Sequence, residues 1–72
     1  MPRDVQILGR MIRLGQLLKL AGVADSGSES KTILAGGGVR VNDEPESRRG
    51  RQLHDGDVVL VGQEALRVAA RP

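Results

Sequence analysis

The sequence contains no phenylalanine, tyrosine or tryptophan, and it contains no cysteine. Without aromatic rings the chain cannot build the stacking platforms on which many proteins hold the bases of single-stranded nucleic acid. Without cysteine it can form neither a disulfide nor a thiolate site, which fits the cytoplasmic location that we expect. The apolar side chains are almost purely aliphatic, so aliphatic packing must hold the fold.

Signals for membranes, metals and nucleotides are missing as well. No apolar run approaches the roughly 20 residues that cross a bilayer, and no signal peptide opens the chain, so we expect no membrane partner. His54 is the only histidine, and its place beside Asp55 in a predicted turn is typical of a solvated side chain. Segment 22–27 has the glycine spacing of a phosphate loop, but Ser28-Glu29 stands where lysine and a hydroxyl residue are required. The sequence therefore predicts no enzyme activity, no metal and no cofactor.

The cations of the sequence are mostly arginine. The 72 residues, which we expect to form a single domain, carry a formal net charge of only +2, yet nine of the eleven cations are arginine. The planar guanidinium can donate two hydrogen bonds to one phosphate. This bias favours a phosphate-binding function, although genomic composition could also produce it.

Two short helices are predicted near the middle of the chain. The first covers about 14–21, where leucines and an alanine recur at helical spacing, and Gly22 ends it. The second covers about 27–35, with Ser26 as its N-cap and Glu29 completing a capping-box pattern. We expect Ser30 to be small enough for a close contact between the helices.

The remaining apolar residues follow strand patterns. Val5 and Ile7 alternate near the start of the chain, with residues 1–4 equally compatible with a frayed terminus. The valines of segment 39–41 are expected to point inward and Arg40 outward. Segments 57–61 and 64–70 are the other expected strands. The fold class is therefore predicted to be α+β, with two short packed helices against a small, mostly antiparallel sheet.

Three arginines form the main cluster of charge, Arg48, Arg49 and Arg51. On an extended edge strand over 46–53, Arg49 and Arg51 would share a face and Arg48 would point the other way, unless Gly50 marks a bulge. Two interpretations stay open: a phosphate-binding site, or a solubilising edge that prevents sheet pairing. The acids Asp43, Glu44 and Glu46 lack the spacing of an EF-hand calcium loop, so we expect a solvated hairpin tip there.

The order of these motifs resembles a known family. Matching segments are Arg13–Leu18, Gly22-Val23, Ser26, Lys31, Ile33-Leu34, Gly38–Asn42 and Gly56-Asp57. They are similar to the RNA-binding domain named after ribosomal protein S-four, over about 12–61. The likeness is greatest to small stand-alone bacterial members, which share the run from Asn42 to Arg51.

The resemblance implies a function and a set of site residues. The family packs its two helices as a helix-turn-helix-like αL motif and binds structured RNA through the second helix, the adjoining turn and the basic hairpin. Carried over, this implicates Ser26, Lys31, Arg40, Arg48, Arg49 and Arg51, with Arg13 and Lys19 as flanking candidates. Many members carry Ser-Arg where this chain has Ser26-Gly27, which shifts its positive charge towards the arginine cluster.

Two functions follow as hypotheses. The first is binding of structured RNA, ribosomal or transfer RNA, by phosphate and shape contacts with poor sequence readout. The second is a protein-interaction module, or a ribosome-associated factor without direct RNA contact, that uses the acidic tip. In either case we expect a monomer, with the ribosome as a candidate partner.

Overall fold

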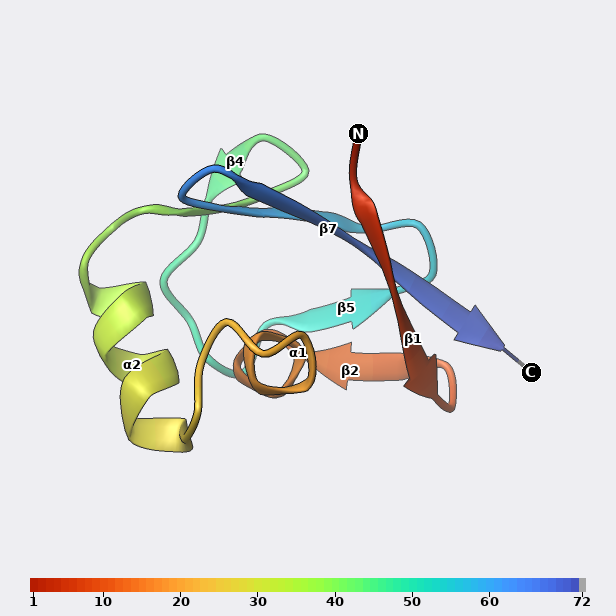
Figure 1. Ribbon diagram of the computed structural model, residues 1–72, viewed down its shortest axis with the longest axis horizontal. Helices are drawn as coiled ribbons and strands as arrows, with labels where there is room; N and C mark the ends of the chain where they lie inside the picture. Colours follow the sequence, from red (N-terminus) through yellow and green to blue (C-terminus); the bar gives the residue numbers. More distant parts are fainter. Residues whose placement is uncertain (72) are drawn as a thin grey trace.

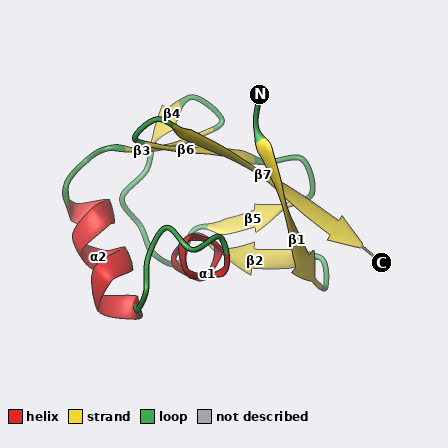
Figure 2. Cartoon of the chain, in the orientation of Figure 1, coloured by secondary structure: helices red, strands yellow, loops and turns green. Residues whose placement is uncertain are grey.

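Two helices pack against one side of a β-sheet in the computed structural model, which describes residues 1–71 (Figure 1). Figure 2 separates the helices, in red, from the strands, in yellow. In chain order the elements are β1 (Arg3–Leu8), β2 (Met11–Arg13), α1 (Leu14–Leu20), α2 (Gly27–Ala35), β3 (Val39–Val41), β4 (Glu44–Pro45), β5 (Gln52–His54), β6 (Val58–Val61) and β7 (Glu64–Arg71). The predicted α+β class is confirmed.

The main sheet has five strands in the order β1-β7-β6-β3-β4. Three of its neighbouring pairs are antiparallel, as expected, but β1 and β7 run parallel, with Val5 opposite Val68. The sheet is therefore mixed. A parallel pair needs a long connection, and here nearly the whole chain separates the two strands. The terminus is not frayed from residue 1 to residue 4, because β1 begins at Arg3.

A second, two-stranded sheet joins β2 to β5, with Ile12 opposite Leu53. Leu53 is fully buried and Ile12 is half-buried. Because β2 runs directly into α1, this pairing brings the arginine cluster, which precedes β5, to the start of α1. The predicted edge strand over 46–53 is wrong for most of its length. Only 52–54 forms a strand, and Figure 2 shows the chain between β4 and β5 as loop.

The two helices have the predicted positions, and their ends are capped as the sequence indicates. Ser26 is the N-cap of α2, and its Oγ accepts a hydrogen bond from the Glu29 backbone N–H at 3.1 Å. Gly22 follows α1 with a φ of +79°, the left-handed conformation that glycine adopts most easily. Ser30 is fully buried, and its hydroxyl donates to the Gly15 carbonyl at 3.2 Å. The expected close contact between the helices is thus confirmed.

The core is aliphatic and lies between the helices and the main sheet. Its buried members come from almost every element: Val5, Ile7, Leu14, Leu17, Leu18, Ala24, Leu34, Val39, Val41, Leu53, Val59, Leu66 and Val68. The two valines of β3 point into it and Arg40 is exposed, as predicted. Within residues 1–71 no helix has the length and apolar character to cross a membrane.

Candidate nucleic-acid interface

The segment from Glu46 to Arg51 forms a loop that ends in a tight turn. The Arg51 backbone N–H donates to the Arg48 carbonyl at 3.3 Å, which closes the turn over its two central residues, Arg49 and Gly50. The three arginines therefore do not alternate across a strand. Arg48 and Arg51 stand at the two ends of the turn, and Arg49 stands at its apex.

A buried carboxylate, Glu46, holds both ends of this turn. Arg48 donates to it through two nitrogens, Nε to Oε2 and Nη2 to Oε1, each at 3.1 Å. Arg51 Nη1 donates to Oε1 at 2.9 Å. The backbone N–H groups of Ser47 and Arg48 also donate to Oε2, both at 3.0 Å. The expectation of a solvated tip is therefore wrong for Glu46, whose side chain is only 7% exposed.

These contacts also set the charge state of the carboxyl group. The side-chain hydrogen bond from Arg48, the Arg48 backbone N–H and the Arg51 side chain together hold the pKa of Glu46 far below its usual range. Burial acts in the opposite direction and is outweighed. In return, the hydrogen bond to Glu46 raises the pKa of Arg48. Two of the three clustered arginines are thus engaged with an acid.

The turn sits directly on the N-terminal end of α1. The first backbone N–H groups of a helix have no partner within the helix. Here Leu14 N–H donates to the Arg51 carbonyl at 2.8 Å, and Gly15 N–H donates to the Arg49 carbonyl at 3.0 Å. The Arg13 guanidinium adds a bond to the Gly50 carbonyl at 3.3 Å. The loop therefore satisfies the helix end, and the helix end fixes the loop.

Arg49 extends from the apex across the surface of α1. Its side chain passes over Gly15 so closely that a Cβ at that position would lie 2.7 Å from Arg49 Cγ. Its Nη1 lies 4.0 Å from the place where a Cβ on Gly27, the first residue of α2, would be. The Arg49 side chain thus runs from Gly15 towards the start of α2, and Gly15 is the glycine at which a Cβ would collide with it. Among the described residues, the four ion pairs do not include Arg49.

An open pocket of about 370 Å³ lies at this place, between the two helices and the turn. It is lined by Arg13, Gly15, Gln16, Lys19, Gly27, Ser30, Arg49 and Gly50. Three of these residues are cationic, and the described residues that line the pocket include no acid. Such a gathering of cations gives the pocket a positive potential, which attracts anions.

A second hollow of about 380 Å³ adjoins the first on the other side of Arg49. It is lined by Lys31, Leu34, Ala35, Ser47 and Arg49. Arg49 therefore belongs to both hollows and connects Lys31 with the cations of the first. Together these four cations, Arg13, Lys19, Lys31 and Arg49, define what we call the basic groove.

Sequence comparison identifies the fold that carries this groove. Residues 5–69 match the S4 domain family. The chain belongs to the S4 domain family. It is also 52% identical, over 61 residues, to the probable ribosome maturation protein RlbA of Bacillus subtilis (strain 168), an alignment that covers 85% of this chain and 86% of the relative. The suspected resemblance to the S-four RNA-binding domain is confirmed.

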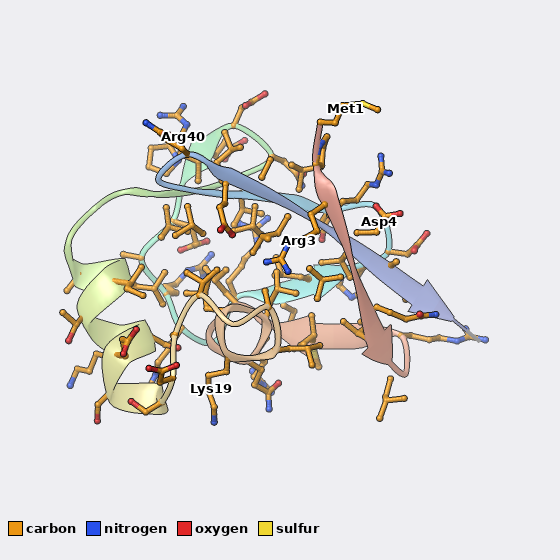
Figure 3. The ribbon with its side chains drawn as sticks, in the orientation of Figure 1. Met1, Arg3, Asp4, Lys19 and Arg40 are labelled. Carbon is orange, nitrogen blue, oxygen red and sulfur yellow. The ribbon has the colours of Figure 1, made fainter. Side chains whose placement is uncertain are left out.

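The basic groove of this S4 domain does not contain every residue that the resemblance implicated. Ser26 is occupied as the cap of α2. Arg40 projects from the face of the sheet that is turned away from the helices, and its guanidinium donates to the Asp43 carbonyl. Figure 3 shows Arg40 and Lys19 on opposite sides of the molecule. Arg48 and Arg51 are not among the described residues that line the two hollows of the groove, and both bind Glu46.

Two residues that shape the site were not predicted as part of it. Gly15 makes room for Arg49, and Glu46 holds the turn. The signal available for Gly15 was a glycine in the first turn of the predicted helix, since a glycine in a helix can mark a place that another group approaches closely. The signal for Glu46 was its spacing, two and five residues before the arginines that it binds.

Potential metal ligands and the histidine were also located in the described part of the chain. No group of three or more metal-ligating side chains occurs within residues 1–71. His54 is exposed at the end of β5, and its backbone N–H donates to the Asp57 carboxylate at 2.7 Å.

Proposed function

We propose that this S4 domain binds structured RNA through the basic groove, by contacts to phosphates and to the shape of the RNA. One observation carries the proposal. The pocket between α1 and α2 gathers three cations and no acid among its described lining residues, in a family of RNA-binding domains. The role is one of binding and not of catalysis.

The position of the groove adds a further reason to expect a phosphate ligand. The groove includes Gly27, where α2 begins, and the N-terminal end of a helix carries partial positive charge. The pocket is open, so a group on a large ligand can reach it. Arg49 can offer a planar fork of donors, and Lys19 and Arg13 can neutralise neighbouring phosphates.

The chemistry of the chain favours RNA with a folded backbone over an unpaired strand. Single-stranded RNA is usually held by stacking its bases on aromatic rings, which this sequence lacks. A double-stranded or tightly folded RNA instead presents its phosphates in a fixed arrangement. Recognition would therefore depend on the spacing of phosphates and only weakly on base sequence.

Ribosomal RNA is the first candidate among structured RNAs. The Bacillus relative is named a probable ribosome maturation protein, and it is similar to this chain over most of both lengths. We propose that this chain acts in the cytoplasm on a ribosomal particle that is being assembled. Transfer RNA is the second candidate, and the two can be compared in one assay.

The test is a titration of the protein with purified bacterial ribosomal RNA at several salt concentrations. One added terminal cysteine would give a single fluorescent label, because the chain has none of its own. Four phosphate contacts predict a slope of log affinity against log salt of about −3. Arg49→Ala should weaken binding about 5-fold and make the slope shallower by about 0.8. Arg40→Ala removes the same charge from the opposite face and should have a smaller effect.

Binding that does not depend on salt, or equal losses for the two variants, would contradict the proposal. Capture of a protein partner that persists after ribonuclease treatment would support the alternative of a protein-interaction module instead. That alternative is weaker than the sequence suggested, because Glu46 does not belong to the exposed acidic tip.

A further inference from the structure

The basic loop beside the groove contains an acid, and by charge alone this acid opposes RNA binding. Glu46 lies within five positions of three arginines and neutralises part of their charge. It is nevertheless buried, and its two oxygens accept five hydrogen bonds in all. An acid used only to improve solubility would be exposed, so the structure calls for another role.

We infer that Glu46 is a positioning residue for RNA binding, which holds Arg49 in the basic groove; this inference rests on the proposed function. The carboxylate binds Arg48 and Arg51, the two ends of the turn. Arg49 stands between them at the apex. Fixing both ends of a four-residue turn fixes the direction in which its apex side chain leaves the backbone.

The same contacts control the backbone beside α1. The carbonyls of Arg49 and Arg51 accept the N–H groups of Gly15 and Leu14, so the turn is docked on the first turn of α1. Glu46 is itself anchored, since its backbone N–H donates to the Val39 carbonyl at 3.0 Å. The chain of contacts runs from β3 through Glu46 to the turn and then to α1. Arg49 is therefore held in place before RNA arrives.

Pre-organisation matters because ordering a long arginine side chain on binding opposes association. If the turn loosened, Arg49 would no longer lie across Gly15, and its phosphate contact would have to be assembled during binding. Glu46 would thus increase RNA affinity although its charge repels RNA. This is the opposite of what electrostatics alone predicts for an acid close to a nucleic-acid site.

Two substitutions separate position from charge. Glu46→Gln keeps the size of the side chain, but its amide nitrogen is a donor and would face at least some of the donors that the carboxylate now accepts. Glu46→Asp keeps the charge but is shorter by one methylene group, so it cannot reach the same partners together. Glu44→Gln is the matched control, because Glu44 is an exposed acid two residues away, on β4.

The experiment titrates each variant with the same ribosomal RNA under conditions in which circular dichroism shows it folded. Glu46→Gln should bind about 3- to 10-fold more weakly, with a salt slope about 0.8 shallower, although it gains one unit of positive charge. The RNA affinity of Glu46→Asp should lie between those of Glu46→Gln and the wild type. Glu44→Gln should bind as tightly as the wild type or up to about 2-fold more tightly. In an Arg49→Ala background, Glu46→Gln should cost less than about 2-fold, because the residue that it positions is already gone.

Several results would overturn the inference. One is that Glu46→Gln and Glu46→Asp each bind RNA as tightly as the wild type or more tightly, and another is that the loss of affinity in Glu46→Gln persists in full when Arg49 is absent. If Glu46→Gln does not fold, the RNA affinity of Glu46→Asp relative to the wild type tests the inference, since this substitution leaves the net charge unchanged. Failure of the wild-type protein to bind RNA in a salt-dependent way would instead refute the proposed function itself.

Discussion

Replacing Gly15 with alanine should weaken RNA binding without destabilising the protein. Glycine in a helix interior is less favourable than alanine by roughly 0.5–1 kcal/mol, and Gly15, the second residue of α1, should gain at most this amount on substitution. The new Cβ would, however, lie 2.7 Å from Arg49 Cγ and 3.4 Å from its Cδ. Carbon atoms rest at about 3.5–4.0 Å from each other, so Arg49 Cγ must retreat by about 1 Å.

The Arg49 side chain is exposed, so Cγ can move away from Gly15 by a rotation about χ1 that leaves the buried core undisturbed. The gain in helix propensity and the cost of moving Arg49 should roughly cancel, and the free energy of unfolding should change by less than about 0.5 kcal/mol. The displaced guanidinium would leave the pocket between the helices. Loss of this contact should cost about 1 kcal/mol of binding free energy, which corresponds to about a 5-fold weaker affinity.

Two measurements on each variant test this reasoning: a urea titration for stability and the fluorescence titration for RNA affinity. Gly38→Ala is the control, because nothing lies within 4 Å of a Cβ at that position and Gly38 has no positive φ. It should leave RNA affinity unchanged. A Gly15→Ala protein that binds RNA as tightly as the wild type would refute the claim that Arg49 must lie across this glycine.

Three further predictions concern the cap, the buried acid and the groove. Ser26→Ala removes the hydrogen bond to the Glu29 N–H and should cost about 1 kcal/mol of stability in urea titrations, with little change in RNA affinity. The depressed pKa of Glu46 means that its contribution to stability is complete above the ordinary value of 4.5 and is lost as the pH falls below it. Urea titrations at about pH 6 and about pH 3 should therefore show that the free energy of unfolding falls less between these pH values for Glu46→Gln than for the wild type. Lys19→Ala and Arg13→Ala should each weaken RNA binding about 2- to 5-fold in the fluorescence titration and make the salt slope shallower.

Features fixed by neighbouring residues could be predicted from the sequence. The serine cap, the glycine stop and the apolar spacing depend on contacts within one or two turns of helix, and both helices were placed correctly from them. The inward valines of β3 follow from the alternation of a strand in the same way. The size of Ser30 was also sufficient to predict a close contact between the helices.

Features that depend on distant residues were missed. The parallel pairing of β1 with β7 joins the two ends of the chain, and no local pattern specifies it. The position of the Arg49 side chain across α1 depends on Gly15, which lies 34 positions earlier in the sequence. Glu46 was read as part of an acidic tip because its neighbours Asp43 and Glu44 are exposed, whereas its burial follows from the folded turn.

The arginine cluster shows what the sequence could predict and what required the structure. Sequence alone left a phosphate site and a solubilising edge as alternatives for the same three residues. The structure divides the cluster: Arg48 and Arg51 bind Glu46, and Arg49 reaches the basic groove. Arg48 and Arg51 thus make a structural contact, and Arg49 is the member of the cluster that we propose contacts RNA.

The most direct test of the basic groove is a nuclear magnetic resonance titration of the labelled protein with a ribosomal RNA hairpin that it binds. The amide signals of Gly15, Gly27 and Gly50, which line the pocket between the helices, should shift or broaden as RNA is added. Those of Arg40 and Leu60, on the opposite face of the sheet, should stay in place. Shifts confined to the outer face of the sheet, with the three glycines unchanged, would contradict the account.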